Sequence, residues 1–282
     1  MSGAATGTIP PNLLDKPDPP DHTADVAAAG RQRGTYMGFV RTLATLLFIL
    51  ALPVAIVTSN IRVLANAPVV YGYSFDRYNA EDATGLSRAD LDSTAAALRQ
   101  YFNNNEKTFY HTVTEGGLPA SVFNARETRH MEDVKVLIVW VNRLQELSVI
   151  FVLAYVVAFF LWARDSNVRQ LAMQALTGLA VGTLFVGGIA VLAAFGFEAA
   201  FVRFHQVLFS NNLWQLDPQR DHLIQMFPQN FWRDITIVLG VMCAVEAALI
   251  GAVAGIYLLS TRGERRSLPG AIDVNTSQTQ AA

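Results

Sequence analysis

Two histidines, His130 and His205, are the residues whose type and spacing best fit chemistry in this 282-residue chain. They lie in ETRHMEDVKVLI and FVRFHQVLF, on either side of two apolar runs that meet at a polar turn, ARDSNVRQ. The centre of that turn is equidistant from both histidines. If the runs form a helical hairpin with the same rise per residue in each arm, the two imidazoles reach the same height. One imidazole can then act as a general base beside a partner that orients or polarises the reacting group.

Three charged residues near the histidines are candidates for supporting them. Glu127 and Asp133 lie one helical turn before and after His130, where a carboxylate can fix the imidazole tautomer and raise its basicity. Arg203 lies beside His205. Carboxylates at this spacing are also common on exposed helix surfaces. Each histidine alone also fits an interfacial residue that reaches toward lipid headgroups. Both interpretations stay open at this point.

A metal site is a competing interpretation of the same region. Nitrogen and oxygen ligands are available from His130, Asp133, His205, Asp217, Asp221 and His222. The spacing does not favour a metal, because the sequence has no HExxH, no paired cysteines and no acidic calcium loop. We therefore expect neither a metal nor a cofactor.

The composition indicates that a membrane positions these residues. The chain is 52% hydrophobic and 16% charged, with a mean hydropathy of +0.29. The only cysteine, Cys243, excludes an intramolecular disulfide, and a net charge of −2 without a basic stripe argues against nucleic-acid binding. We predict a membrane all-α fold: a four-helix transmembrane bundle with a small α+β extracytoplasmic domain between the first two helices. The predicted spans are residues 37–60, 130–163, 171–197 and 234–260.

Arginines set the predicted topology. They lie at the start of the first span, within the turn at 164–170 and after the last span, so the positive-inside rule places both termini in the cytoplasm. Residues 61–129 then form the extracytoplasmic domain, and residues 198–233 an outer helix extension with an interfacial loop. Residues 1–36 and 261–282 are predicted to be disordered cytoplasmic tails.

Local signals divide the extracytoplasmic domain further. Ser87 with Asp90 predicts a helix start before an amphipathic stretch that ends at residues 103–105. KTFYHTVT and LPASVF read as a β-hairpin with Gly116 and Gly117 in the turn. Nothing between Ala125 and Trp162 breaks a helix.

Several residues within the spans carry predictions about helix packing and bending. Glu246, near the middle of the last span, is expected to face the bundle interior, either as a proton relay or as a neutral acid bonded to another helix. GLAVG (178–182) and GAVAG (251–255) predict close helix packing within the bundle. Pro53 is expected to kink the first span. Gly196 is the position at which the second arm of the hairpin could bend.

Three segments together resemble a bacterial integral-membrane family that includes the lipoprotein intramolecular transacylase (Lit): YGYSFDRYNAEDATGLSRADL, FNARETRHMEDVKVLI and FVRFHQVLFSNNLWQL with LIQMFPQNFW. The resemblance implies an acyltransferase of the cell membrane. It would move an acyl chain from the diacylglyceryl-cysteine of a lipoprotein to that cysteine's α-amino group, leaving a lyso-form lipoprotein. By motif position, the resemblance implies that His130 and His205 are the two essential histidines, at the extracytoplasmic face, with a diacylated lipoprotein and membrane lipid as partners.

General chemistry is compatible with this implication. An α-amino group has a pKa of ~7.7 to 8, so a histidine can accept its proton during attack on an ester. Amine and ester belong to one substrate, which the enzyme need only fold, and an acyl-histidine intermediate remains an alternative. The other functions left open are a metal-dependent membrane hydrolase and a non-enzymatic membrane assembly or sensor protein.

Overall fold

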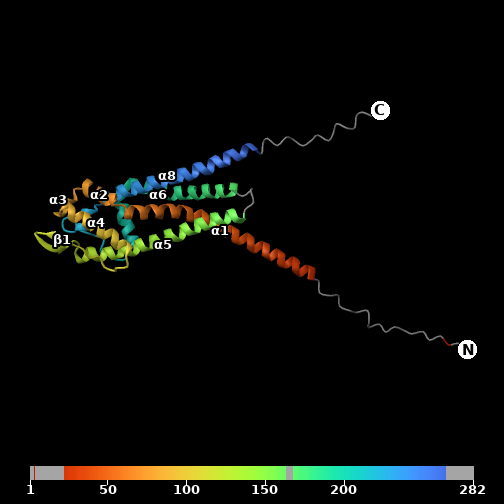
Figure 1. Cartoon of the computed structure of the whole chain (residues 1–282), viewed down its shortest axis with the longest axis horizontal. Helices are drawn as coiled ribbons and strands as arrows, with labels where there is room; N and C mark the ends of the chain where they lie inside the picture. Colours follow the sequence, from red (N-terminus) through yellow and green to blue (C-terminus); the bar gives the residue numbers. More distant parts are fainter. Residues whose placement is uncertain (1–2, 4–21, 163–167, 265–282) are drawn as a thin grey trace. The chain divides into compact units, whose positions relative to one another are not determined.

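The computed structural model describes Gly3, residues 22–162 and residues 168–264 (Figure 1). The first helix, α1, runs from His22 to Asn66. Its residues up to Thr45 belong to one compact unit, and everything from Leu46 onward belongs to a second unit that contains the features below. The prediction of a tail over residues 1–36 is wrong for residues 22–36, which are helical. Alanine and arginine favour helix, and this stretch is rich in both.

Four long helices dominate the described part of the chain: α1, α5 (Ala125–Trp162), α6 (Val168–Leu208) and α8 (Gln229–Glu264). Each contains a segment long and apolar enough to cross a membrane, at Tyr36–Asn66, Ala125–Leu161, Val168–Val191 and Gln229–Thr261. The unbroken helix expected from Ala125 to Trp162 is confirmed. Residues 164–167 of the turn predicted at 164–170 lie outside the described residues, whereas residues 168–170 already belong to α6. Most of the C-terminal tail also lies outside the described residues, although α8 continues through residues 261–264.

The connection between α1 and α5 is a small α+β region, which we call the head. It contains α2 (Pro68–Arg77), α3 (Ala80–Thr84), α4 (Arg88–Asn103), β1 (Thr112–Glu115) and β2 (Leu118–Ser121). The predicted helix and hairpin are both confirmed. The Ser87 side chain accepts a hydrogen bond from the backbone N–H of Asp90, and the antiparallel strands turn at Gly116 and Gly117, which both have positive φ.

The core of the head is shared with the long helices. Leu91, Leu98 and Tyr101 of α4 are buried in one cluster with Met131 of α5 and Phe231 of α8. A short helix, α7 (His222–Met226), adds to the same cluster from the segment between α6 and α8. Figure 1 shows α2, α3, α4 and β1 gathered beside one end of the long helices. A head of this size therefore stays folded by burying its apolar face against the bundle.

Glycines of α6 pack directly against α1. A Cβ atom at Gly178 would lie 2.9 Å from the carbonyl oxygen of Ile49, and one at Gly182 would lie 2.5 Å from Cβ of Pro53. α1 continues as a helix through Pro53, which has no N–H to donate to Ile49. The GLAVG motif thus packs within the bundle, as predicted, and it fits around the proline turn.

Polar side chains join α1 to the other helices. The Asn60 amide donates a hydrogen bond of 3.1 Å to the Glu246 carboxylate, so the expectation that Glu246 has a polar partner on a neighbouring helix is confirmed. Arg62 donates to Gln145 at 2.8 Å and forms an ion pair with Glu146 at 3.4 Å. These contacts hold α1 against α8 and α5 on the side of the bundle that carries the head.

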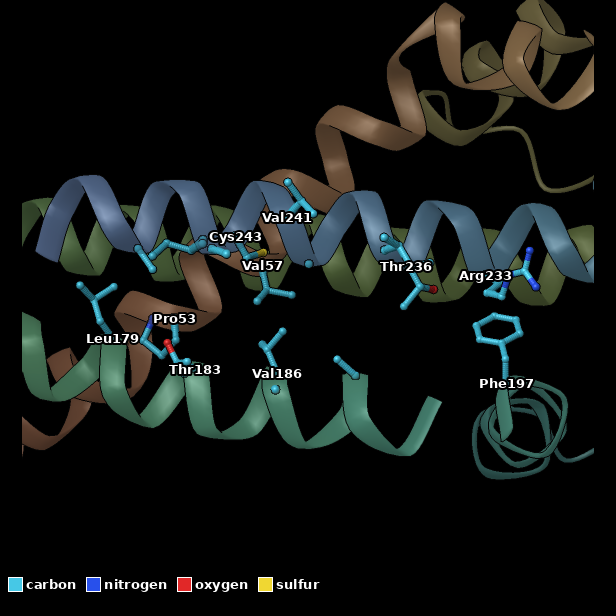
Figure 2. A pocket seen from close by; sticks show the side chains of 18 of the residues that line it. Pro53, Val57, Leu179, Thr183, Val186, Phe197, Arg233, Thr236, Val241 and Cys243 are labelled. Atoms are coloured by element: carbon cyan, nitrogen blue, oxygen red, sulfur yellow. The ribbon is translucent and has the colours of Figure 1, made fainter. Parts of the chain in front are cut away.

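One long helix is not straight. Gly196 in α6 has φ −178° and ψ 68°, which are not helical values, so α6 consists of two helical segments joined at this residue. In Figure 2 the first segment runs across the view, whereas the segment that carries Phe197 is seen end-on. The assumption of a straight second arm is therefore wrong, and the position of His205 depends on this bend.

Candidate active site

The two histidines lie against each other. His130 on α5 and His205 on the second segment of α6 have ring centroids 6.0 Å apart, with ring planes inclined by 37°. Their exposed fractions are only 6% and 7%. The structure thus brings together the pair that the sequence singled out, but by a bend in α6 rather than by equal rise along two straight arms.

The protonation of His205 follows from its hydrogen bond. Its Nδ1 lies 2.7 Å from the carbonyl oxygen of Phe201, one turn earlier on α6. A carbonyl oxygen only accepts hydrogen bonds, so Nδ1 carries the proton and Nε2 keeps a free lone pair. Burial lowers the pKa of His205, and the bond to Phe201 opposes that shift only in part. The ring is therefore neutral at pH 7 and able to accept a proton at Nε2.

His130 has an unused polar atom. Its Nδ1 is buried and has no hydrogen-bond partner among the described residues. A buried polar atom without a partner costs about 1 to 3 kcal/mol, which a folded protein rarely tolerates without a reason. Since the His205 ring lies beside the His130 ring, an imidazole with an unpartnered nitrogen and a neutral base are close together. A substrate atom that hydrogen-bonds to Nδ1 would remove the cost.

Aromatic rings surround the pair. Phe201 and Trp214 lie 4.3 Å and 4.9 Å from the His205 ring by centroid, and Phe209 meets the edge of His130 at 5.3 Å. Low polarity of this kind strengthens any hydrogen bond formed at the histidines. We did not predict Phe209 or Trp214 from the sequence, although both flank the polar stop SNN that ends α6.

Two hydrogen bonds hold the segment that carries these rings. The Asn211 amide donates to the Asp133 carboxylate at 2.8 Å, and the Arg126 guanidinium donates to the carbonyl of Asn212 at 2.8 Å. Both partners belong to α5, one turn on either side of His130. The predicted supporting residue Asp133 therefore fixes the segment that follows His205, rather than bonding to either imidazole.

The other two supporting candidates also bond elsewhere. Glu127 is 1% exposed, and its carboxylate accepts from the backbone N–H of Asn124 at 2.8 Å and of Leu223 at 2.7 Å. Glu127 thus caps the N-terminus of α5 and links that N-terminus to α7. Arg203 is exposed and donates to Gln206 at 3.2 Å.

Asp221 and His222, two of the residues considered as metal ligands, are likewise engaged in other hydrogen bonds. The Asp221 carboxylate accepts from the Asn124 amide at 2.8 Å and from the backbone N–H of Asp217 at 2.6 Å. His222 Nδ1 lies 2.8 Å from the carbonyl oxygen of Val122. Within residues 22–162 and 168–264, no three histidine, cysteine or acidic side chains gather as a metal-ion site. These hydrogen bonds connect the residues between β2 and α5 with the start of α7.

A large, partly open cavity lies between α1, α6 and α8 (Figure 2). It has a volume of about 780 Å³. Aliphatic side chains such as Val57, Val186 and Val241 line it, and Phe197 and Arg233 stand at the end nearest the head. Neither histidine lines the cavity.

Comparison with known proteins gives a consistent result. A curated relative from Aquifex aeolicus (strain VF5), described as an uncharacterized protein, is 28% identical over 128 residues, which is 45% of this chain and 54% of that protein's length. The chain thus spans about half the length of the curated relative it matches. The solved structure of the membrane integral lipoprotein intramolecular transacylase Lit from Bacillus cereus has the same fold, with a TM-score of 0.64 and 18% identity. That match covers 82% of this chain and 100% of the other.

A second structure of the Bacillus cereus protein, in which one histidine is replaced by alanine, aligns with a TM-score of 0.63 at 17% identity over 82% of this chain and 99% of the other. Together with its four membrane-length helices, this fold makes the chain a multi-pass integral membrane protein. The family model described as lipoprotein intramolecular transacylase Lit matches residues 46–232, more than half of the sequence and both histidines included. The chain therefore belongs to the lipoprotein intramolecular transacylase family.

Proposed function

We propose that this protein transfers an acyl chain, within one lipoprotein molecule, from the diacylglyceryl group on the amino-terminal cysteine to that cysteine's α-amino group. Membership of an acyltransferase family supports the reaction class. The observation that carries the proposal is the buried pair itself: a neutral His205 with a free Nε2, 6.0 Å by centroid from a His130 ring that has an unpartnered Nδ1.

The two imidazoles suit the two needs of the reaction. The α-amino nitrogen attacks an ester carbonyl carbon and gives up a proton, which His205 Nε2 accepts. His130, protonated at Nδ1, donates a hydrogen bond to the oxyanion that develops on the carbonyl oxygen. When the C–O bond breaks, His205 returns the proton to the glyceryl oxygen. The products are an amide at the cysteine nitrogen and a free glyceryl hydroxyl, so atoms and charges balance without any further reactant.

The surroundings of the pair favour this chemistry. Rings such as Phe209 and Trp214 exclude water, which would otherwise hydrolyse the ester and screen the hydrogen bond to the oxyanion. Amine and ester are attached to the same cysteine, so the site has only to bring them together. Effective molarities of ~10⁵ to 10⁸ M are available to well-oriented groups of one molecule. A covalent nucleophile on the enzyme is therefore unnecessary.

The proposed site belongs to the extracytoplasmic face of the cell membrane. The arginines at the start of the first span, in the turn at 164–170 and after the last span support cytoplasmic termini, because basic residues are retained on the cytoplasmic side. Single cysteines introduced at Asn104 of the head and at Ser260 near the end of α8 test this. The first should react with an impermeant thiol reagent in intact cells, whereas the second should react only after lysis.

The function is tested by mass spectrometry of lipoprotein amino termini from a host that expresses the protein or its variants. The wild-type protein should convert diacylglyceryl lipoproteins to the lyso form. His130→Ala and His205→Ala should each lower conversion by about 10² to 10⁴-fold, with little further loss in the double variant, because the two groups act in one step.

His111→Ala is a matched control. His111 lies in the head between α4 and β1, and its ring contacts Ser93 on the surface of the head. This variant should keep wild-type conversion. Near-normal conversion by either single variant of the pair would refute the mechanism, and unchanged lipoproteins with the wild-type protein would refute the function.

A further inference from the structure

We propose that the cavity between α1, α6 and α8 receives the far end of an acyl chain whose ester lies at His130 and His205, and that its depth makes the enzyme selective for long chains. The inference rests on the proposed function, because it assigns a place to part of that substrate.

The chemistry of the cavity matches an alkyl chain. Its volume of about 780 Å³ falls in the range of ~300 to 1,000 Å³ typical of small-molecule sites. The walls come from membrane-length helices and consist mainly of aliphatic side chains and glycines. The hydroxyl of Thr236, one of the few polar groups there, already donates to the carbonyl of Trp232 at 2.8 Å. A polar headgroup would find few partners inside, whereas an alkyl chain needs none.

A row of rings connects the head end of the cavity with the histidines. Phe197 lines that end, and Phe201 and His205 follow it on the second segment of α6. The centroids of Phe197 and Phe201 are 6.2 Å apart, and those of Phe201 and His205 are 4.3 Å apart. Eight residues of helix separate Phe197 from His205, which is about 12 Å. A chain whose ester is at His205 must therefore cross this apolar face before it reaches the cavity, and only a long chain does so.

The polar end of the cavity lies at the depth that an ester group requires. Arg233 stands at its head end beside Phe197, near the start of α8 (Figure 2). A guanidinium at the end of a spanning helix belongs at the level of the lipid headgroups. The mouth of the cavity is thus at the depth where the ester groups of a lipid are, and its interior extends toward the middle of the membrane.

Glycines keep the cavity open. Gly187 of α6 and Gly240 of α8 both line it, and a Cβ atom built at either would have nothing within 4 Å. Gly182 differs, because Pro53 occupies the space that its side chain would fill. Transfer of a chain from lipid to such walls brings little free energy, since lipid tails are equally apolar. The cavity therefore acts through shape, and its effect should be seen in chain-length preference rather than in affinity.

Substitutions that fill the cavity test the inference. Gly240→Leu and Gly187→Leu, on different helices, should each lower transfer from a dipalmitoyl lipopeptide by about tenfold or more while leaving transfer from a dioctanoyl lipopeptide near the wild-type rate. Gly188→Leu is the matched control. Gly188 is exposed, does not line the cavity and also has nothing within 4 Å, so its variant should keep the wild-type ratio of the two rates.

A second measurement does not depend on turnover. A lipopeptide with a diazirine at the end of each palmitoyl chain is photolysed with the His205→Ala protein, and crosslinked peptides are identified by mass spectrometry. Crosslinks should fall on buried cavity residues of α6 and α8, such as Leu179 and Cys243. A wild-type ratio of palmitoyl to octanoyl transfer in both filled variants, or crosslinks confined to lipid-facing residues, would overturn the inference. If the wild-type protein transfers neither chain but the cavity is crosslinked, the proposed function fails and the chain site stands.

Discussion

Replacement of Glu127 separates a structural role from a role in tuning His130. Its carboxylate is 1% exposed and accepts two backbone hydrogen bonds, from Asn124 at 2.8 Å and Leu223 at 2.7 Å. Glu127→Ala leaves both buried N–H groups without an acceptor, at about 1 to 3 kcal/mol each. We therefore expect a loss of roughly 2 to 6 kcal/mol, which is a large part of the ~5 to 15 kcal/mol that stabilises an ordinary domain.

The assay compares unfolding and activity in detergent or lipid nanodiscs. Urea or thermal unfolding gives the loss of stability, and the acyl-transfer rate below the unfolding transition gives the effect on chemistry. Glu132→Ala is the matched control. Glu132 lies on the same helix, but its carboxylate accepts one exposed hydrogen bond, from Thr108 at 2.6 Å, so its replacement should cost under about 1 kcal/mol.

Glu127→Gln tests the role directly. An amide oxygen still accepts one of the two N–H groups, so the variant should unfold more easily than wild type but keep the wild-type dependence of rate on pH. A stability within about 0.5 kcal/mol of wild type for Glu127→Ala would refute the structural reasoning. A shifted pH profile without loss of stability would assign Glu127 to His130 instead.

Further predictions concern the base and the bundle. Burial lowers the pKa of His205, so its ring stays neutral when the pH falls below the ordinary histidine pKa of ~6.5. The unfolded chain takes up this proton first, so the free energy of unfolding decreases between pH ~6.5 and the lowered pKa of the folded protein. In an NMR titration of the imidazoles, His205 should therefore change protonation below pH ~6.5, and a transition above that pH would contradict this. Asn60→Leu removes the partner of Glu246 and should cost about 0.6 to 1.7 kcal/mol in a thermal unfolding assay, whereas Glu246→Gln, which keeps an acceptor, should cost less. Gly182→Ala forces a Cβ atom against Pro53 at 2.5 Å and should lower stability by about 1 to 3 kcal/mol, unless α1 and α6 separate without cost.

Short-range signals in the sequence determined the elements. The four long helices follow from apolar stretches that exceed the thickness of a bilayer, a property of composition alone. The start of α4 follows from Ser87, because a capping side chain bonds within its own turn. The hairpin follows from Gly116 and Gly117, since their positive φ is a local requirement. In each case the residues that decide the structure are neighbours in the chain.

The sequence also selected the two histidines, but only the tertiary structure decided how they meet. A glycine at position 196 permits a bend without requiring one or setting its direction. The direction depends on bonds between distant residues, such as Asp133 with Asn211 and Arg126 with Asn212, and on the rings they hold in place. No local pattern encodes such pairs.

The same reason explains why the sequence left the roles of Glu127 and Asp133 open and did not reveal the cavity. Glu127 and Asp133 have helical spacing from His130, yet each carboxylate finds a better partner in a segment some 80 to 100 residues later in the chain. The cavity exists because Gly187 and Gly240 come from different helices and leave the same space empty. Sequence periodicity determines which face of a helix a residue occupies. Only the packing between helices determines which residues that face contacts.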